Sequence, residues 1–110
     1  MGIKEIMGIL GLSRRAGKLC CGHDAVIESI VKDKATLVIL SSDASERLKN
    51  EIKHAANYNG KNIEVIESAF LMQDFYSGIG KKSAVFSITD QSFKEKIKTL
   101  FGEEQYGSKI

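Results

Sequence analysis

The chain has 110 residues, 43% of them hydrophobic and 27% charged, and its formal net charge at pH 7 is +2. Length and composition are those of one globular domain, large enough to bury roughly two-thirds of the surface that the unfolded chain exposes. The small net charge excludes a protein that is basic throughout, so any nucleic-acid surface must be a local patch, and no run approaches the ~20 apolar residues of a membrane helix.

The first predicted element is an amphipathic helix over residues 3–15. A secretory signal peptide is not expected here, because Lys4 and Glu5 interrupt the apolar segment and two arginines follow it. The apolar residues that recur at helical spacing are Ile3, Ile6, Met7 and Leu10.

A basic stretch follows this helix. Its cations are Arg14, Arg15 and Lys18, and Gly17 and Gly22 frame them. Gly17 can adopt a positive φ and end the helix, and Gly22 permits a close backbone approach before the next one. Such a turn directs backbone N–H groups and positive charge the same way, which suits an anionic ligand. An ordinary solvated turn between two helices is the alternative interpretation.

Four chemically versatile side chains follow, at Cys20, Cys21, His23 and Asp24. We interpret the adjacent cysteines as free, buried and inert thiols in a reducing cytoplasm. A metal site built from both thiols and His23 would lack a fourth ligand. The side chains of His23 and Asp24 are expected to point apart at a helix start, which argues against an acid–base pair. The chain offers no set of nucleophile, base and orienting group, so we expect neither an enzyme nor a cofactor.

The middle of the chain alternates between helix and strand. A second helix is expected to begin near His23 and to end at residues 32–34, and the uncharged run 36–40 is typical of a strand covered on both faces. Capping chemistry for a third helix follows at Ser41, Ser42, Asp43 and Ser45, and residues 63–66 form the next strand. The second helix is marked by Val26, Ile27, Ile30 and Val31, and the buried stripe of the third is Leu48, Ile52 and Ala55.

The last third of the chain repeats this alternation. Ser68 is expected to cap a fourth helix, residues 78–83 to form a loop, and residues 84–88 to form a strand. Asp90 caps a last helix, which Gly102 closes. The domain is thus predicted to span residues 1–102, with a poorly ordered polar tail at 103–110. The inner faces of the two helices are expected to carry Leu71, Phe75 and Ile79, and Phe93, Ile97 and Leu100.

The alternation of helices and strands predicts parallel pairing with helices on both faces of the sheet, which is a three-layer α/β/α sandwich. Residues 19–21 are expected to add a short fourth strand at the edge of the sheet. Binding sites on such sheets gather where loops leave the ends of the strands.

Several segments together resemble a known family of ribosomal proteins. The chain is similar to bacterial members of the large-subunit ribosomal protein seven-Ae and thirty-e group, whose members bind RNA kink-turns. The resemblance implies an α/β/α sandwich with a mixed sheet of about four strands, and RNA binding without catalysis or cofactor. The segments that carry it are residues 10–18, Gly22 with Ala25 and Val26, residues 35–45, and later residues 75–81 and 85–90.

The resemblance also places the RNA contacts. The family has a Gly-x-Asn-Glu-x-x-Lys pattern after its first short strand, and here Gly22 matches it. Asp24 stands where the family has an amide, and Glu28 stands in place of the lysine. Lys32, one turn further along the helix, could partly replace that lysine. The second family contact, in the loop before the last strand, matches at Gly80, Lys81 and Lys82, whereas its usual Leu-Gly pair is Phe75-Tyr76 here. Tyr76 could stack on a base or pack against the sheet, and packing is the favoured interpretation.

The sequence therefore predicts a cytoplasmic, monomeric protein that docks on structured RNA, such as the ribosome or another RNA with a kink-turn, and does not enter a membrane. The alternative is a protein-interaction module on the same scaffold whose RNA affinity is weak or lost; the charge of Glu28 favours it. The predicted RNA-binding residues are Arg14, Arg15, Lys18, Gly22, His23, Asp24, Lys32, Gly80, Lys81 and Lys82.

Overall fold

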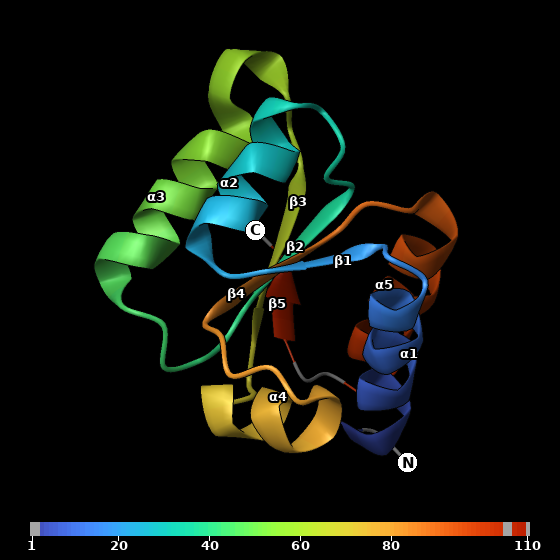
Figure 1. Ribbon diagram of the computed structural model, residues 1–110. Helices are drawn as coiled ribbons and strands as arrows, with labels where there is room; N and C mark the ends of the chain where they lie inside the picture. Colours follow the sequence, from blue (N-terminus) through green and yellow to red (C-terminus); the bar gives the residue numbers. More distant parts are fainter. Residues whose placement is uncertain (1–2, 105–106, 110) are drawn as a thin grey trace.

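The computed structural model describes residues 3–104 and 107–109, which form five α-helices, one short 3₁₀-helix and five strands (Figure 1). None of the described helices is long and apolar enough to cross a membrane. In chain order the elements are α1 (Ile3–Arg15), β1 (Leu19–Cys21), α2 (His23–Val31), β2 (Leu37–Leu40), α3 (Glu46–Asn57), η1 (Tyr58–Gly60), β3 (Glu64–Ser68), α4 (Met72–Ile79), β4 (Val85–Ile88), α5 (Gln91–Glu104) and β5 (Gly107–Lys109).

The sheet has the strand order β1-β4-β2-β3-β5 among the described residues. Strands β2 and β3 are parallel, while β4 is antiparallel to both of its neighbours and β5 is antiparallel to β3. The sheet is therefore mixed, and β1 is the expected short strand at its edge. The mixed sheet that the resemblance implies is confirmed, whereas the parallel pairing predicted from the alternation of elements holds only for β2 and β3.

The position of α4 explains why β4 runs the other way. A parallel pair needs a connection that returns along the whole sheet, as α3 does between β2 and β3. Helix α4 stays instead at the end of the sheet where β2 and β3 finish, packed against α1 (Figure 1). Strand β4 consequently starts at that same end, with Val85 opposite Leu40.

Helices cover both faces of the sheet, which confirms the three-layer sandwich. Helices α2 and α3 lie on one face, and α1 and α5 lie on the other (Figure 1). Because successive side chains of a strand point to opposite faces, β2 contributes to both cores. Leu37 and Ile39 pack with α1, α4 and α5, whereas Val38 and Leu40 pack with α2 and α3.

Local sequence signals set most helix starts. The Ser45 hydroxyl accepts the Leu48 N–H at 3.1 Å at the start of α3. Asp90 accepts the Phe93 N–H at 3.0 Å at the start of α5. Both caps were predicted, and each satisfies a backbone donor that has no partner within its own helix.

Helix α4 starts differently from the prediction. Ser68 ends β3 and donates its hydroxyl to the Leu40 carbonyl at 2.7 Å, so it does not cap the helix. The starting N–H groups are accepted instead by two carboxylates, that of Asp74 from Leu71 at 2.8 Å and that of Asp43 from Met72 at 3.1 Å. Leu71 precedes the helix in an extended conformation and is 48% exposed, so the prediction that it faces the core was wrong.

The C-terminal segment also differs from the prediction. Helix α5 continues past Gly102 to Glu104, because a helical glycine is only mildly unfavourable. Residues 107–109, expected to belong to a poorly ordered tail, form β5 and pair with Ile66, Glu67 and Ser68 of β3. Residues 105, 106 and 110 of the predicted tail lie outside the described residues.

Candidate nucleic-acid interface

The turn after α1 is built as its glycine predicts. Gly17 has φ +74°, and the Lys18 N–H closes the helix by donating to the Ser13 carbonyl at 2.8 Å. The positive φ suits glycine because it has no Cβ to clash with the backbone. This turn leaves Arg14 and Arg15 in the last turn of the helix, where cations favour its dipole.

Arg14 joins the two cationic segments of the sequence. Its guanidinium Nη1 donates to the Ile79 carbonyl at the end of α4, at 2.8 Å. Gly80 follows in a left-handed conformation with φ +77°, and a Cβ on it would lie 3.5 Å from the Arg14 guanidinium. The start of the 80–84 loop thus lies against the end of α1, although the two are 65 residues apart in sequence.

The Cys21 thiol lies beside this junction. Burial raises the pKa of Cys21, although the positive charges of Lys81 and Arg14 nearby act in the opposite direction. The thiol is therefore kept protonated, as expected of an inert thiol. Cys20 packs on the opposite face of the sheet from Cys21, because the two are adjacent in a strand. Both cysteines are free and half-buried, less enclosed than predicted.

Gly22 links the edge strand to α2. It has φ +94° and ψ 163°, its N–H donates to the Val85 carbonyl at 3.0 Å, and its own carbonyl accepts the Val26 N–H at 3.0 Å. Gly22 therefore both ends the pairing of β1 with β4 and begins α2. It places His23 and Asp24 in the first helical turn, where the leading N–H groups have no partner within the helix.

His23 is held by two carboxylates. Its Nδ1 lies 3.0 Å from Asp24 Oδ1, and its Nε2 lies 2.7 Å from Glu51 Oε2 on α3. The hydrogen bond with Glu51, and then that with Asp24, raises the pKa of His23 above its ordinary 6.5. The prediction that His23 and Asp24 point apart was wrong, because the ring folds back over the helix start toward α3. Glu51 was not predicted as a site residue, since nothing in its local sequence indicates a contact 28 residues away.

A depression beside α2 contains two further predicted cations. Lys18 and Lys32 line it together with Glu28, at the opposite end of β1 from Gly22. Lys32 Nζ lies 2.6 Å from Glu28 Oε2 and forms an ion pair one helical turn apart. The predicted shared face of these two residues is confirmed, but Lys32 is already paired with the carboxylate that replaces the family lysine.

The surface around the 80–84 loop is mixed in polarity. Tyr76, the neighbour of the buried Phe75, is 53% exposed, because one residue along α4 turns a side chain by about 100°. The prediction that it packs inside was therefore wrong. The Asp43 carboxylate accepts the Met72 N–H at the start of α4, and the positive charge of Lys82 nearby favours its ionised form.

The predicted cations differ in whether they have a partner. Within residues 3–104 and 107–109, ion pairs are formed by Lys32 but not by the other predicted cations. Unpaired, exposed cations can contact phosphates without first breaking a bond. Those without an ion pair are Arg14, Arg15, Lys18, Lys81 and Lys82.

The predicted residues thus form two neighbouring groups on either side of β1. Arg14, Gly80 and Lys81 gather beside Cys21, and Lys18 and Lys32 line the depression beside α2. His23 and Asp24 lie at the start of α2. The carboxylates of Asp24 and Glu51, which both contact His23, add negative charge to a region expected to be positive. The arrangement can bind phosphate groups and present a tyrosine ring.

Comparison with known proteins gives consistent matches over most of the chain. Residues 4–97 match the model of the ribosomal protein L7Ae/L30e/S12e/Gadd45 family. The chain is 36% identical over 98 residues to the RNA-binding protein YlxQ of Enterococcus faecium, covering 88% of this chain and 91% of that protein. It is 34% identical over 97 residues to the RNA-binding protein YlxQ of Bacillus subtilis, strain 168, covering 87% and 94%.

A solved structure matches the fold closely. It is a protein of unknown function from Bacillus halodurans, with a TM-score of 0.79 and 30% identity, and the match covers 88% of this chain and 96% of that one. The similarity therefore extends over most of both chains.

Proposed function

Because the chain belongs to the ribosomal protein L7Ae/L30e/S12e/Gadd45 family, we propose that it is an RNA-binding protein that docks on structured RNA and catalyses no reaction. The relatives that are 36% and 34% identical are both named RNA-binding proteins, which supports this assignment. Arg14, Lys81 and Lys82 contact phosphates, and Gly22 lets the RNA approach the start of α2 closely.

The contact of Arg14 with the end of α4 is the observation on which this function rests. Two short cationic segments would each be too weak to hold RNA alone. The 2.8 Å hydrogen bond from Arg14 to the Ile79 carbonyl combines them into one surface. Arg15 and Lys18 extend this surface on either side of the turn.

A kink-turn is the proposed type of RNA, bound weakly. The resemblance places a lysine at the position of Glu28, and a carboxylate cannot donate to a base edge and is repelled by phosphate. His23 partly offsets the charge of Asp24, since its hydrogen bonds with Glu51 and Asp24 raise the pKa of His23 and so favour its protonated form. The exposed Tyr76 ring offers a stacking surface for an unpaired base.

The proposed setting is the cytoplasm, on the ribosome or on another structured RNA. The free thiols of Cys20 and Cys21 suit a reducing compartment. The proposed RNA-binding unit is a monomer.

The test of this function is a titration against a standard kink-turn and a straight duplex at several salt concentrations. Replacing Arg14→Glu and Lys81→Glu together should weaken binding and flatten its dependence on salt, because fewer counterions are released. The slope of log affinity against log salt should fall by roughly 0.9 for each duplex phosphate that the variant no longer neutralises.

A matched control separates local contacts from net charge. Lys4→Glu with Lys96→Glu makes the same change in charge at exposed positions near the start of α1 and on α5. This variant should keep the slope of the natural chain. An unchanged slope in folded Arg14→Glu/Lys81→Glu, or an equal loss in the control, would place the RNA contacts elsewhere.

One observation favours a second candidate function, a protein-interaction module. Carboxylates stand among the cations of the proposed surface, at Asp24, Glu28, Asp43 and Glu51, and they would repel phosphate. A chain that binds neither RNA of the titration at low salt would support this second function.

A further inference from the structure

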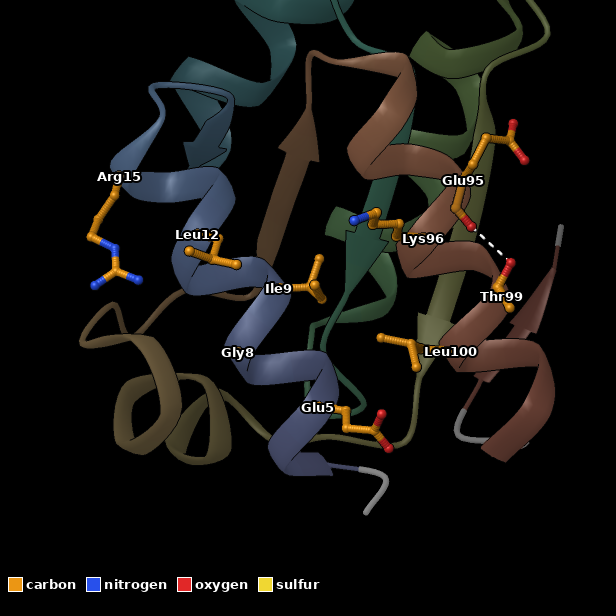
Figure 2. Close-up of a pocket in the computed structure, with 9 residues that line it drawn as sticks. All are labelled: Glu5, Gly8, Ile9, Leu12, Arg15, Glu95, Lys96, Thr99 and Leu100. Carbon is orange, nitrogen blue, oxygen red and sulfur yellow. Dashed lines mark hydrogen bonds between the residues drawn. The ribbon is translucent and has the colours of Figure 1, made fainter.

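A groove between α1 and α5 adjoins the proposed RNA surface at Arg15. Its volume is about 760 Å³. Ile9 and Leu100 point toward each other across it, and Leu12 stands beside them on α1 (Figure 2). Leu12 is 46% exposed, so the groove presents apolar side chains to solvent. It belongs to the helical layer formed by α1 and α5, and of its lining residues only Arg15 is used by the function proposed above.

One face of α1 borders this groove and carries a regular pattern. At about 100° per residue, Glu5, Gly8, Leu12 and Arg15 fall within an arc of about 80°. Gly8 forms a hollow in this face, since a Cβ added to it would meet nothing within 4 Å. The face therefore offers, in order, an acidic residue, a hollow, an exposed leucine and a basic residue.

This pattern is complementary to its own reverse. Two α1 helices can lie antiparallel, related by a two-fold axis at the level of residue 10. Each residue n of one helix then faces residue 20 − n of the other. Leu12 then faces Gly8 of the second copy, and Glu5 faces Arg15. We propose that two copies of this chain associate through α1 and the α1/α5 groove as an antiparallel, two-fold symmetric pair.

The charged residues that line the groove are complementary to α1 of a second copy. Helices α1 and α5 run in opposite directions, so Lys96 lies toward the Arg15 end of the groove (Figure 2). Glu95 also lines this end, so the two cations and one carboxylate there leave a net positive charge, whereas Glu5 makes the other end negative. An antiparallel α1 brings its own Glu5 to the positive end and its Arg15 to the negative end, which sets the direction of the second copy.

RNA fits this groove less well than a second copy does. Its centre is formed by Ile9, Leu12 and Leu100, whereas a phosphate backbone requires a row of cations. A pair of two-helix faces belongs to the smaller class of interfaces, so the association should be weak and reversible. The chain is expected to be a monomer when dilute and to pair as its concentration rises.

Sedimentation of the nuclease-treated chain tests this pairing without any RNA. Between about 10 µM and about 1 mM the weight-average mass should rise from one chain toward two. Leu12→Gln should weaken pairing at least tenfold, because the leucine that fills the hollow becomes polar. Val31→Gln is the matched control, since Val31 is 65% exposed and lies at the end of α2, on the other face of the sheet.

Charge reversal tests the orientation of the pair. Glu5→Arg or Arg15→Glu alone places like charges opposite each other and should weaken pairing about fivefold or more, since repulsion replaces attraction at two equivalent positions. The double variant Glu5→Arg/Arg15→Glu restores opposite charges and should recover the affinity of the natural chain. A single mass at all concentrations, equal losses in Leu12→Gln and Val31→Gln, or no recovery in the double variant would each overturn the proposal.

Discussion

His23 connects two helices through one side chain. Both ring nitrogens lie within hydrogen-bonding distance of carboxylates, at 3.0 Å from Asp24 and 2.7 Å from Glu51. A neutral imidazole has only one N–H, so both contacts are hydrogen bonds only when the ring is protonated. Protonated His23 therefore fastens the start of α2 to α3, and this contact should depend on pH.

The pH dependence of stability follows from the raised pKa of His23. A group whose pKa is higher in the folded chain stabilises the fold fully below its unfolded pKa of about 6.5, and this stabilisation is lost as pH rises through the folded value. The free energy of unfolding lost in His23→Gln should thus be larger near pH 6 than near pH 8. Urea titrations of both proteins across this range measure it.

An NMR titration of the same residue supplies the check. Glu51→Gln removes the main cause of the shift and should lower the pKa of His23. If the His23 titration is the same in Glu51→Gln and in the natural chain, the contact with α3 does not exist in solution.

Glu28 is the residue at which this chain differs most from the pattern of its family. Glu28→Lys should strengthen binding to a kink-turn about tenfold to a hundredfold, because a donor replaces a carboxylate and Lys32 is released from its ion pair. Glu28→Gln removes the charge without adding a cation and should give an intermediate gain. Titration of all three proteins at one salt concentration measures this; tight binding by the natural chain with no gain from lysine would show that Glu28 faces away from the RNA.

At the scale of elements, α4 decides where the second cationic segment lies. It packs against α1 so closely that a Cβ at Gly78 would come within 2.5 Å of Met7 Cγ. The same helix ends at Gly80, next to the lysines of the loop. The contact between Gly78 and Met7 therefore sets the distance between Arg14 and Lys81.

Gly78→Ala should push α4 away from α1. We expect it to cost about 1–3 kcal/mol of stability through overpacking, and to weaken RNA binding because Lys81 moves away from Arg14. Urea unfolding gives the first quantity and an RNA titration the second. Gly102→Ala is the control, since that helical position has open space and alanine should stabilise it by up to about 1 kcal/mol.

A double variant then shows whether Met7 causes the loss. In Met7→Ala/Gly78→Ala the shorter side chain makes room for the new methyl group, so the combined cost should be smaller than the sum of the two single costs. Additive costs would mean that the helices do not touch at this point.

Elements were predictable from sequence where local chemistry determines them. The uninterrupted apolar run of β2 and the caps at Ser45 and Asp90 needed no information from the rest of the chain. The direction of β4 was not predictable in this way, because it depends on α4 packing against α1. The cap of α4 was missed for the same reason, since Asp43 reaches Met72 from 29 residues away.

The candidate site follows the same division between local and distant contacts. The positive φ at Gly17 and the cations of the two segments were predicted from the sequence. The hydrogen bonds from Arg14 to Ile79 and between His23 and Glu51 join segments that are far apart, and only the folded chain brings them together. The sequence could therefore predict most of the surface, including Asp24 and Glu28, but not the carboxylates that Glu51 and Asp43 add from distant segments.

At the scale of the whole molecule, the two proposed surfaces meet at one residue. Arg15 lies beside Arg14 at the end of α1 and also lines the α1/α5 groove. The other residues of the two surfaces are separate, so a substitution in one surface should not change binding at the other. RNA binding and pairing should therefore be separable by mutation everywhere except at Arg15.

Three variants test this separation. Leu12→Gln should lose pairing while keeping both its RNA affinity and its salt slope, because Leu12 has no charge to give to phosphate. Lys81→Glu should weaken RNA binding and leave the sedimentation of the free chain unchanged, and Arg15→Glu should weaken both. RNA titrations and sedimentation on the same three proteins measure these effects. A loss of RNA affinity in Leu12→Gln would mean that the α1/α5 groove itself contacts RNA, and the docking surface would then extend along α1 instead of ending at its last turn.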